Sequence, residues 1–219
     1  MLNKVLYKTY DNLPIDEREA LRYAGCRGEV DEKMQALLQE CVKESESVLS
    51  YKVVYTVVQA SSLMEKWQDK LLCARLQNAE YAVVFASTIG LGIDRLILKN
   101  ESVSPTKALF MQSLGAERIE SLCNAFCKDI KTACEEKGYK AGARFSAGYG
   151  DFSIERQREI FALLSPEKTI GLTLNDSLLM SPTKSVTAII PIGKSVEKEN
   201  CGCQACEKDD CEYRENYGN

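Results

Sequence analysis

The chain has 219 residues, of which 45% are hydrophobic and 27% are charged, and these values are ordinary for a globular protein with a full core. Its net charge of −4 argues against nucleic-acid binding, because contacts to phosphates require clustered and unbalanced lysine and arginine. No apolar run approaches the roughly 20 residues that cross a bilayer, and no signal-peptide core is present, so we expect a cytoplasmic protein without a membrane partner. There is no histidine, which excludes Ser-His triads, histidine metal sites and an imidazole general base.

The first half of the chain predicts two capped helices and two strands. The opening segment is polar, and Asp16 and Asp31 are each placed to cap a following helix. The β-branched and aromatic run over residues 51–58 predicts a strand. A helix over residues 62–77 and a second strand over residues 81–86 are expected to follow.

The second half predicts one long helix and little regular sheet. Residues 104–137 are expected to form the longest helix, with Pro105 in its first turn and Gly138 as its C-terminal stop. The other expected elements are a short helix over residues 154–164 and strands over residues 171–174 and 185–192. Helices and strands alternate without a regular rhythm, which favours an α+β fold with a small, mostly antiparallel sheet and long flanking helices over a doubly wound fold.

A glycine pair after the second expected strand is similar to part of a dinucleotide-binding loop. Gly90 and Gly92 fit the first two glycines of G-x-G-x-x-G, but Arg95 stands where the third glycine is needed. Without that glycine the helix cannot pack closely on the strand. A structural turn is therefore the favoured interpretation.

A second glycine-rich segment, residues 144–151, has the chemistry of a ligand-binding loop. Glycines let a ligand approach the backbone closely, and the guanidinium of Arg144 matches the geometry of a carboxylate. Tyr149 adds a ring face and a hydroxyl group. These residues describe a loop able to hold an amino-acid-like ligand, and the alternative from the residues alone is a glycine-rich connection with a solvated arginine.

Several motifs in one order resemble the C-terminal activation domain of cobalamin-dependent methionine synthase, which binds S-adenosylmethionine. They are Arg144-x-Ser146-x-Gly148-Tyr149, a helix ending Leu163-Leu164, Ile170-Gly171-Leu172-Thr173-Leu174, and Ser177 to Pro182 with Ser185-Val186 beyond. Upstream, residues 85–91 and 116–119 also have counterparts at similar spacing, whereas the first 80 residues match only loosely.

The resemblance assigns S-adenosylmethionine to the loop. It implies that Arg144 meets the methionine carboxylate, that the Ser146 and Gly148 backbones contact the ligand, and that Tyr149 lines the pocket.

The resemblance also implies an acidic ligand contact on the long helix. That position aligns with Ser121, and Glu120, one position away, is expected to face elsewhere.

The implied function is the reductive reactivation of methionine synthase. S-adenosylmethionine would provide a methyl group, and a donor such as flavodoxin or ferredoxin would provide one electron, to cobalamin on a separate corrinoid-binding methionine synthase core. No general base is needed, because the metal is the nucleophile. The chain would then be a free-standing accessory subunit of a methyltransferase system in methionine biosynthesis. A non-catalytic S-adenosylmethionine-binding adaptor and a metal-binding adaptor of a corrinoid protein remain alternatives.

The C-terminus is expected to form a cysteine-rich tail over residues 195–219, after an activation-domain-like domain over residues 1–194. The tail carries Cys201, Cys203, Cys206 and Cys211. Four close thiolates suit zinc or an iron–sulfur cluster, although the C-x-C-x2-C-x4-C spacing is a standard signature of neither. A reduced tail without metal is the alternative.

Overall fold

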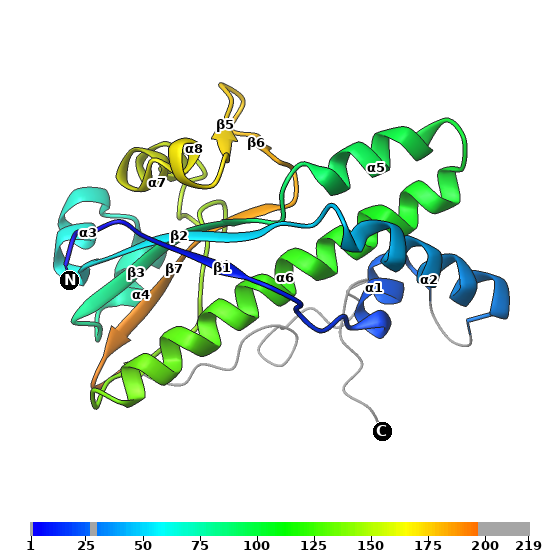
Figure 1. Ribbon diagram of the computed structural model, residues 1–219. Helices are drawn as coiled ribbons and strands as arrows, with labels where there is room; N and C mark the ends of the chain where they lie inside the picture. Colours follow the sequence, from blue (N-terminus) through cyan, green and yellow to red (C-terminus); the bar gives the residue numbers. More distant parts are fainter. Residues whose placement is uncertain (1, 27–29, 197–219) are drawn as a thin grey trace.

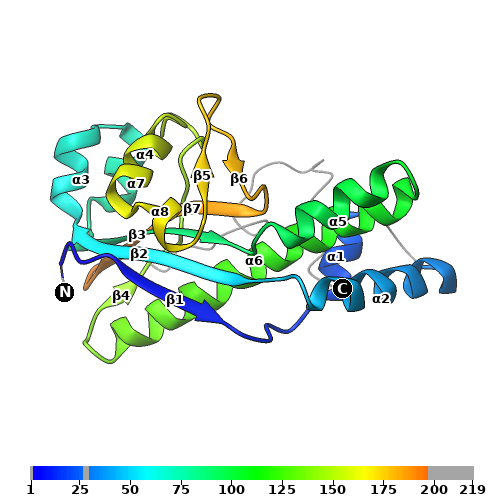
Figure 2. The same ribbon diagram turned by 45° about the horizontal axis from the view of Figure 1, so that its top comes forward.

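The computed structural model describes residues 2–26 and 30–196 (Figure 1). These residues form an antiparallel five-stranded sheet with helices on both faces, which confirms the expected α+β class (Figures 1 and 2). The strands lie in the order β1 (Leu6–Tyr10), β2 (Tyr51–Gln59), β3 (Tyr81–Thr88), β7 (Ser185–Gly193) and β4 (Lys140–Ala141).

Two groups of helices cover the two faces of the sheet, each enclosing its own hydrophobic core. The first face carries α1 (Glu17–Tyr23), α2 (Glu32–Glu46), α5 (Gly92–Glu101) and the long α6 (Pro105–Glu135). The second face carries α3 (Ala60–Trp67), α4 (Lys70–Leu76), α7 (Arg156–Leu164) and α8 (Pro166–Thr169). Among the described residues, no helix is both long and apolar enough to cross a membrane.

The helix starts agree with the sequence-based expectations. The carboxylates of Asp16 and Asp31 accept hydrogen bonds from the backbone N–H groups of Glu19 and Met34, three residues into their helices. Pro105 occupies the first turn of α6, and Gly138 follows its end at a φ of 73°.

Three expectations about secondary structure were wrong. The polar opening segment contains the edge strand β1, whose five residues alternate between half-buried and exposed. The helix expected over residues 62–77 is broken into α3 and α4 at Gln68, which has a φ of 56°. The strand expected over residues 171–174 shortens to β5 (Thr173–Leu174), which pairs only with β6 (Met180–Ser181) in a separate hairpin.

The glycine pair after β3 is a structural turn, as expected. Gly90 has a φ of 84°, which L side chains rarely adopt. A β-carbon on Gly92 would lie 2.3 Å from the carbonyl oxygen of Val48, so only glycine allows this close contact with the chain that follows α2.

An ion pair buried in the middle of α6 links this helix to the N-terminal segment. Arg118 is fully buried, and its Nε donates to Oε2 of Glu117 at 2.5 Å. Its Nη atoms donate to the carbonyl oxygens of Leu13 and Pro14 at 2.8 and 2.6 Å. The Asp16 backbone N–H donates to Oε1 of Glu117 at 3.1 Å, so the pair holds the chain between β1 and α1 against α6.

Replacing Glu117 with glutamine is expected to lower the free energy of unfolding by roughly 3–5 kcal/mol, because it leaves the buried Arg118 guanidinium without a countercharge. Urea denaturation measures this loss. Glu155→Gln is the matched control, since its partner Arg158 is exposed and such a surface pair contributes about 0–1 kcal/mol. Equal losses in the two variants would contradict the structural role of the buried pair.

Candidate functional site

The glycine-rich loop is anchored to the sheet by alternate residues. Phe145 donates its N–H to the carbonyl of Ile189 at 3.0 Å and accepts the Ile189 N–H at 2.8 Å. Phe145 and Ala147 are buried in the core between the sheet and α3, α4 and α7. Because side chains alternate along an extended chain, Arg144 and Ser146 point away from this core.

Beyond Ala147 the loop makes a tight turn. Gly148 has a φ of 98°, and its N–H donates to the carbonyl of Phe152 at 2.7 Å. Phe152 donates in return to the carbonyl of Tyr149 at 3.0 Å, which leaves the Tyr149 side chain 70% exposed. A side chain at position 148 would be strained at this φ and would crowd Ile154.

Arg144 forms an ion pair with Glu120 of α6 and lies 3.4 Å from Oδ1 of Asn124. Glu120 and Asn124 are four residues apart and therefore share one face of the helix. The expectation that Glu120 faces elsewhere was wrong, because the loop approaches α6 from this face. Ser121 is rotated by about 100° and joins the buried pair instead, donating to Oε1 of Glu117 at 2.7 Å.

The charges around this ion pair influence one another. Burial alone would lower the pKa of Arg144, but the electrostatic influence of the Cys123 side chain and of the Glu120 carboxylate, which also accepts a hydrogen bond from Arg144, outweighs it and raises the pKa. Burial and the charge of Glu120 also raise the pKa of Tyr23, at the end of α1. A cation, an anion and a phenol therefore meet where α1, α6 and the loop converge.

A broad hollow of about 600 Å³ lies beside this point. It is lined by residues 14–18 and by Ser121. Ser121 and Glu120 are consecutive on α6, so the hollow and the Arg144 ion pair lie on different flanks of the same helical turn.

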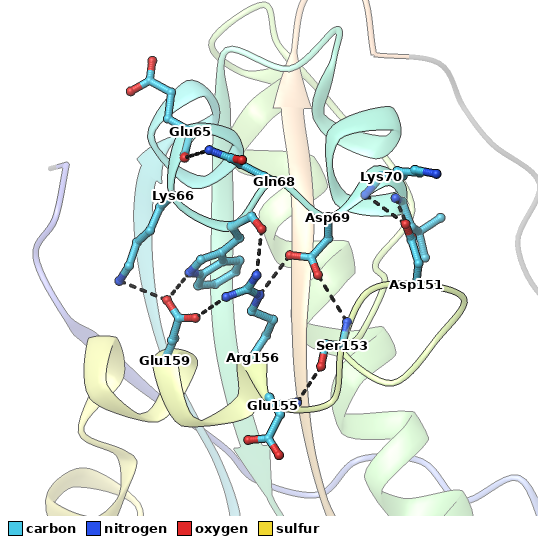
Figure 3. Close-up of polar contacts among 12 residues, drawn as sticks. Glu65, Lys66, Gln68, Asp69, Lys70, Asp151, Ser153, Glu155, Arg156 and Glu159 are labelled. Atoms are coloured by element: carbon cyan, nitrogen blue, oxygen red, sulfur yellow. Dashed lines mark hydrogen bonds and ion pairs between the residues drawn. The ribbon is translucent and has the colours of Figure 1, made fainter.

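A polar network holds the far end of the loop against the break between α3 and α4 (Figure 3). The carboxylate of Asp151 accepts the backbone N–H groups of Lys70 and Leu71 at 3.1 and 2.9 Å, at the start of α4. Asp69 accepts Nε of Arg156 at 2.9 Å. Two carboxylates thus cross-link the loop and α7 to this break.

The network continues through Arg156 to Trp67. Arg156 donates to the Trp67 carbonyl at 2.7 Å and to Oε1 of Glu159 at 2.6 Å, and Glu159 also accepts the indole N–H of Trp67 (Figure 3). This network was not predicted from the sequence, because one unbroken helix was expected over residues 62–77. The Gln68-Asp69 pair between two apolar helical runs was the available signal.

Comparison with known families identifies the chain. A sequence model described as "Vitamin B12 dependent methionine synthase, activation domain" matches residues 68–217. The chain belongs to this family. No individual curated protein matches the sequence. Among solved structures, the crystal structure of the MetH reactivation domain bound to AdoHcy is similar with a TM-score of 0.63 over 90% of this chain and 80% of that one, at 15% identity.

The family match includes both the glycine-rich loop and α6, so the sequence resemblance to the activation domain is confirmed. Of the site residues expected from sequence, Arg144, Ser146, Gly148 and Tyr149 lie on one loop, with Arg144 directed at α6. Glu120, which the resemblance did not assign, adds an anionic partner for Arg144 to the candidate site.

The expected metal ligands Cys201, Cys203, Cys206 and Cys211 lie outside the described residues. Within residues 2–26 and 30–196, no group of three or more histidine, cysteine, aspartate or glutamate side chains is arranged to hold a metal ion.

Two cysteines of α6, Cys123 and Cys134, are buried in the hydrophobic core. Cys123 is fully buried, and its sulfur lies 3.4 Å from the Ser87 hydroxyl. Burial raises the pKa of the Cys123 thiol from 9.0 to about 12, so the group stays neutral beneath the Arg144 ion pair at physiological pH.

Iodoacetamide at pH 8 is expected to leave Cys123 unmodified in the folded protein and to alkylate it in urea, since only an accessible thiolate reacts. Mass spectrometry after digestion measures both states, with the half-buried Cys73 as the comparison. Alkylation of native Cys123 at the rate of Cys73 would contradict this assignment.

The raised pKa of Cys123 also makes the folded state less stable as pH rises above 9, because the unfolded chain then releases a proton that the folded chain keeps.

Proposed function

We propose that this activation domain binds S-adenosylmethionine between its glycine-rich loop and α6, and serves the reductive reactivation of a cobalamin-dependent methionine synthase. The proposal rests on the ion pair between Arg144 of the loop and Glu120 of α6. The methionine end of the ligand is a zwitterion with a carboxylate and an ammonium group. Arg144 is complementary to the carboxylate, and Glu120 is complementary to the ammonium group. The similar MetH domain was solved with AdoHcy, the demethylated form of this ligand.

The ligand would exchange one ion pair for two. Its carboxylate would take the guanidinium of Arg144, and its ammonium group would take Glu120. The paired N–H groups of arginine match a carboxylate in two parallel hydrogen bonds. Asn124, 3.4 Å from Arg144, provides an additional neutral hydrogen-bonding group on the same face of α6.

The loop would hold the rest of the ligand through its backbone and its tyrosine. The turn at Gly148 permits close approach, and Ser146 contributes main-chain groups that do not depend on its side chain. Tyr149 is 70% exposed, and its ring can cover the sulfonium, because a cation is attracted to an aromatic face. This covering would exclude water from the methyl group.

The chemistry needs a second protein. Cobalamin on a corrinoid-binding methionine synthase core would supply the nucleophile that takes the methyl group, and flavodoxin or ferredoxin would supply the electron. The residues of this chain bind and orient the donor, and positioning alone lowers the barrier substantially when reacting atoms are held in line. The lack of histidine is compatible with this division, since no proton is transferred.

We also propose that residues 1–194 form the ligand-binding domain and residues 195–219 a cysteine-rich tail holding zinc or an iron–sulfur cluster. The presence of four thiols close together in the sequence supports this, since four thiolates can complete the coordination of zinc or of a cluster. Metal and sulfide analysis of anaerobically purified protein tests it, and protein that contains neither zinc nor iron would refute it.

Replacing Arg144 with alanine is expected to weaken S-adenosylmethionine binding by about 1.5–3 kcal/mol, roughly 10- to 150-fold, because a charge-assisted hydrogen bond is lost. Titration calorimetry measures the affinity. Arg158→Ala is the control, since Arg158 is exposed on α7 and contacts Glu155 and the Asp176 carbonyl. Equal affinities for the two variants would remove Arg144 from the site.

A reconstituted reaction tests the function itself. The protein, S-adenosylmethionine, reduced flavodoxin and a corrinoid protein loaded with cob(II)alamin are expected to form methylcobalamin, followed by its visible absorption spectrum. Omission of this chain or use of Arg144→Ala should slow the reaction. Tight ligand binding without methylcobalamin formation would instead indicate a non-catalytic adaptor, and absence of binding would refute the proposal.

A further inference from the structure

A separate half-open pocket of about 450 Å³ lies between the C-terminal half of α6 and the sheet. Its base is formed by side chains on one face of the sheet. Strand pairing places Tyr55 beside Phe85, Val57 beside Val83, and Tyr81 beside Ile192, in three successive rows. Leu6 of β1 and Leu2, which forms an isolated bridge with Val57, extend the base beyond β2.

Aromatic contacts close the pocket at both ends. At one end Phe126 of α6 packs on Tyr55 and Phe85, with ring centroids 5.1 and 4.9 Å apart. At the other end Tyr139 packs edge-on against Tyr81 at 5.9 Å. Phe85 and Tyr81 are four residues apart on β3, about 13 Å along the strand, and the pocket lies between them.

The pocket is lined by one cation, which follows Glu135 and Glu136 in the chain. Lys137, near the end of α6, is the one charged residue among the described lining residues. Lys194 lies just beyond, with its Nζ 5.8 Å from the centroid of the Tyr139 ring. Glu80 lies near the Tyr139 hydroxyl, whose pKa it raises, but it does not line the pocket.

We infer that this pocket binds an organic anion with an apolar aromatic or aliphatic body. The body would lie on the valine and tyrosine side chains of the sheet, and the anionic group would pair with Lys137. The volume is within the range of about 300–1,000 Å³ that small-molecule sites occupy. The site is distinct from the Arg144 site, since Ile130 and Lys137 are 10 and 17 residues beyond Glu120 on or next to α6, roughly 15–25 Å along a helix.

Paired fluorescent probes test the inference without knowledge of the natural ligand. 8-Anilinonaphthalene-1-sulfonate carries the required charge, and N-phenyl-1-naphthylamine has the same rings without it. Ala133 lines the pocket but is exposed on α6, so Ala133→Trp should fill the space without disturbing the core. Thr132→Trp, on the adjacent exposed position, is the matched control.

Ala133→Trp is expected to weaken both probes about tenfold or more, whereas Thr132→Trp leaves them unchanged. Lys137→Glu is expected to weaken the sulfonate about fivefold and leave the neutral probe unchanged, with Lys131→Glu as its control. Urea midpoints verify that the variants are folded.

Three outcomes would overturn the inference. Equal binding by the two tryptophan variants would place the probes elsewhere. Equal loss of the sulfonate in Lys137→Glu and Lys131→Glu would remove the anion preference. A dimer that Ala133→Trp converts to a monomer in sedimentation would show that a second copy covers the pocket. All three leave the S-adenosylmethionine proposal unaffected, because its test uses calorimetry on Arg144 variants.

Discussion

The buried Glu117–Arg118 pair is the constraint on which the candidate site depends. A guanidinium without access to water must have its donors satisfied, and here the N-terminal chain provides two carbonyl oxygens while the neighbouring glutamate provides the charge. These bonds fix both the rotation of α6 about its axis and its position along that axis relative to the N-terminal segment. Glu120 lies one turn further along, so its direction toward Arg144 is a consequence of the same pair.

The loop is held by contacts on both of its sides. Phe145 binds β7 through its backbone, and Asp151 binds the start of α4, so the intervening turn is fixed at each end. Between these anchors lie two glycines, Gly148 and Gly150, and the exposed Tyr149. This arrangement separates the residues that anchor the loop, Phe145 and Asp151, from the two candidate ligand contacts, since Arg144 reaches α6 and Tyr149 is exposed.

Much of the fold follows from local sequence signals, and the errors have identifiable physical causes. The caps at Asp16 and Asp31, the proline at the start of α6 and the apolar central strands were predictable because each is encoded within a few residues. The edge strand β1 was not, because a strand with one solvated side carries a weak apolar pattern. The break at Gln68 depends on contacts with residues more than 80 positions away.

The candidate site likewise has a part that is encoded in one segment of the sequence and a part that depends on tertiary packing. The glycines, Arg144 and Tyr149 could be predicted as a candidate ligand loop from sequence, since their chemistry is contained in one segment. The role of Glu120 was not recognisable, because a shift of one residue on a helix rotates a side chain by about 100° and only the packing of α6 fixes which face is presented. The pocket beneath the second half of α6 likewise arises from the pairing of four strands, which no single segment records.

In the proposed binding mode, the Arg144–Glu120 ion pair competes with the ligand for both of these side chains. Each charge is already satisfied, so any incoming zwitterion gains only the difference between the new contacts and the old one. Affinity is thereby reduced relative to a site with free charges, and departure is correspondingly assisted, because the two side chains close on each other as the ligand leaves. Such a site favours repeated exchange of its occupant over long retention.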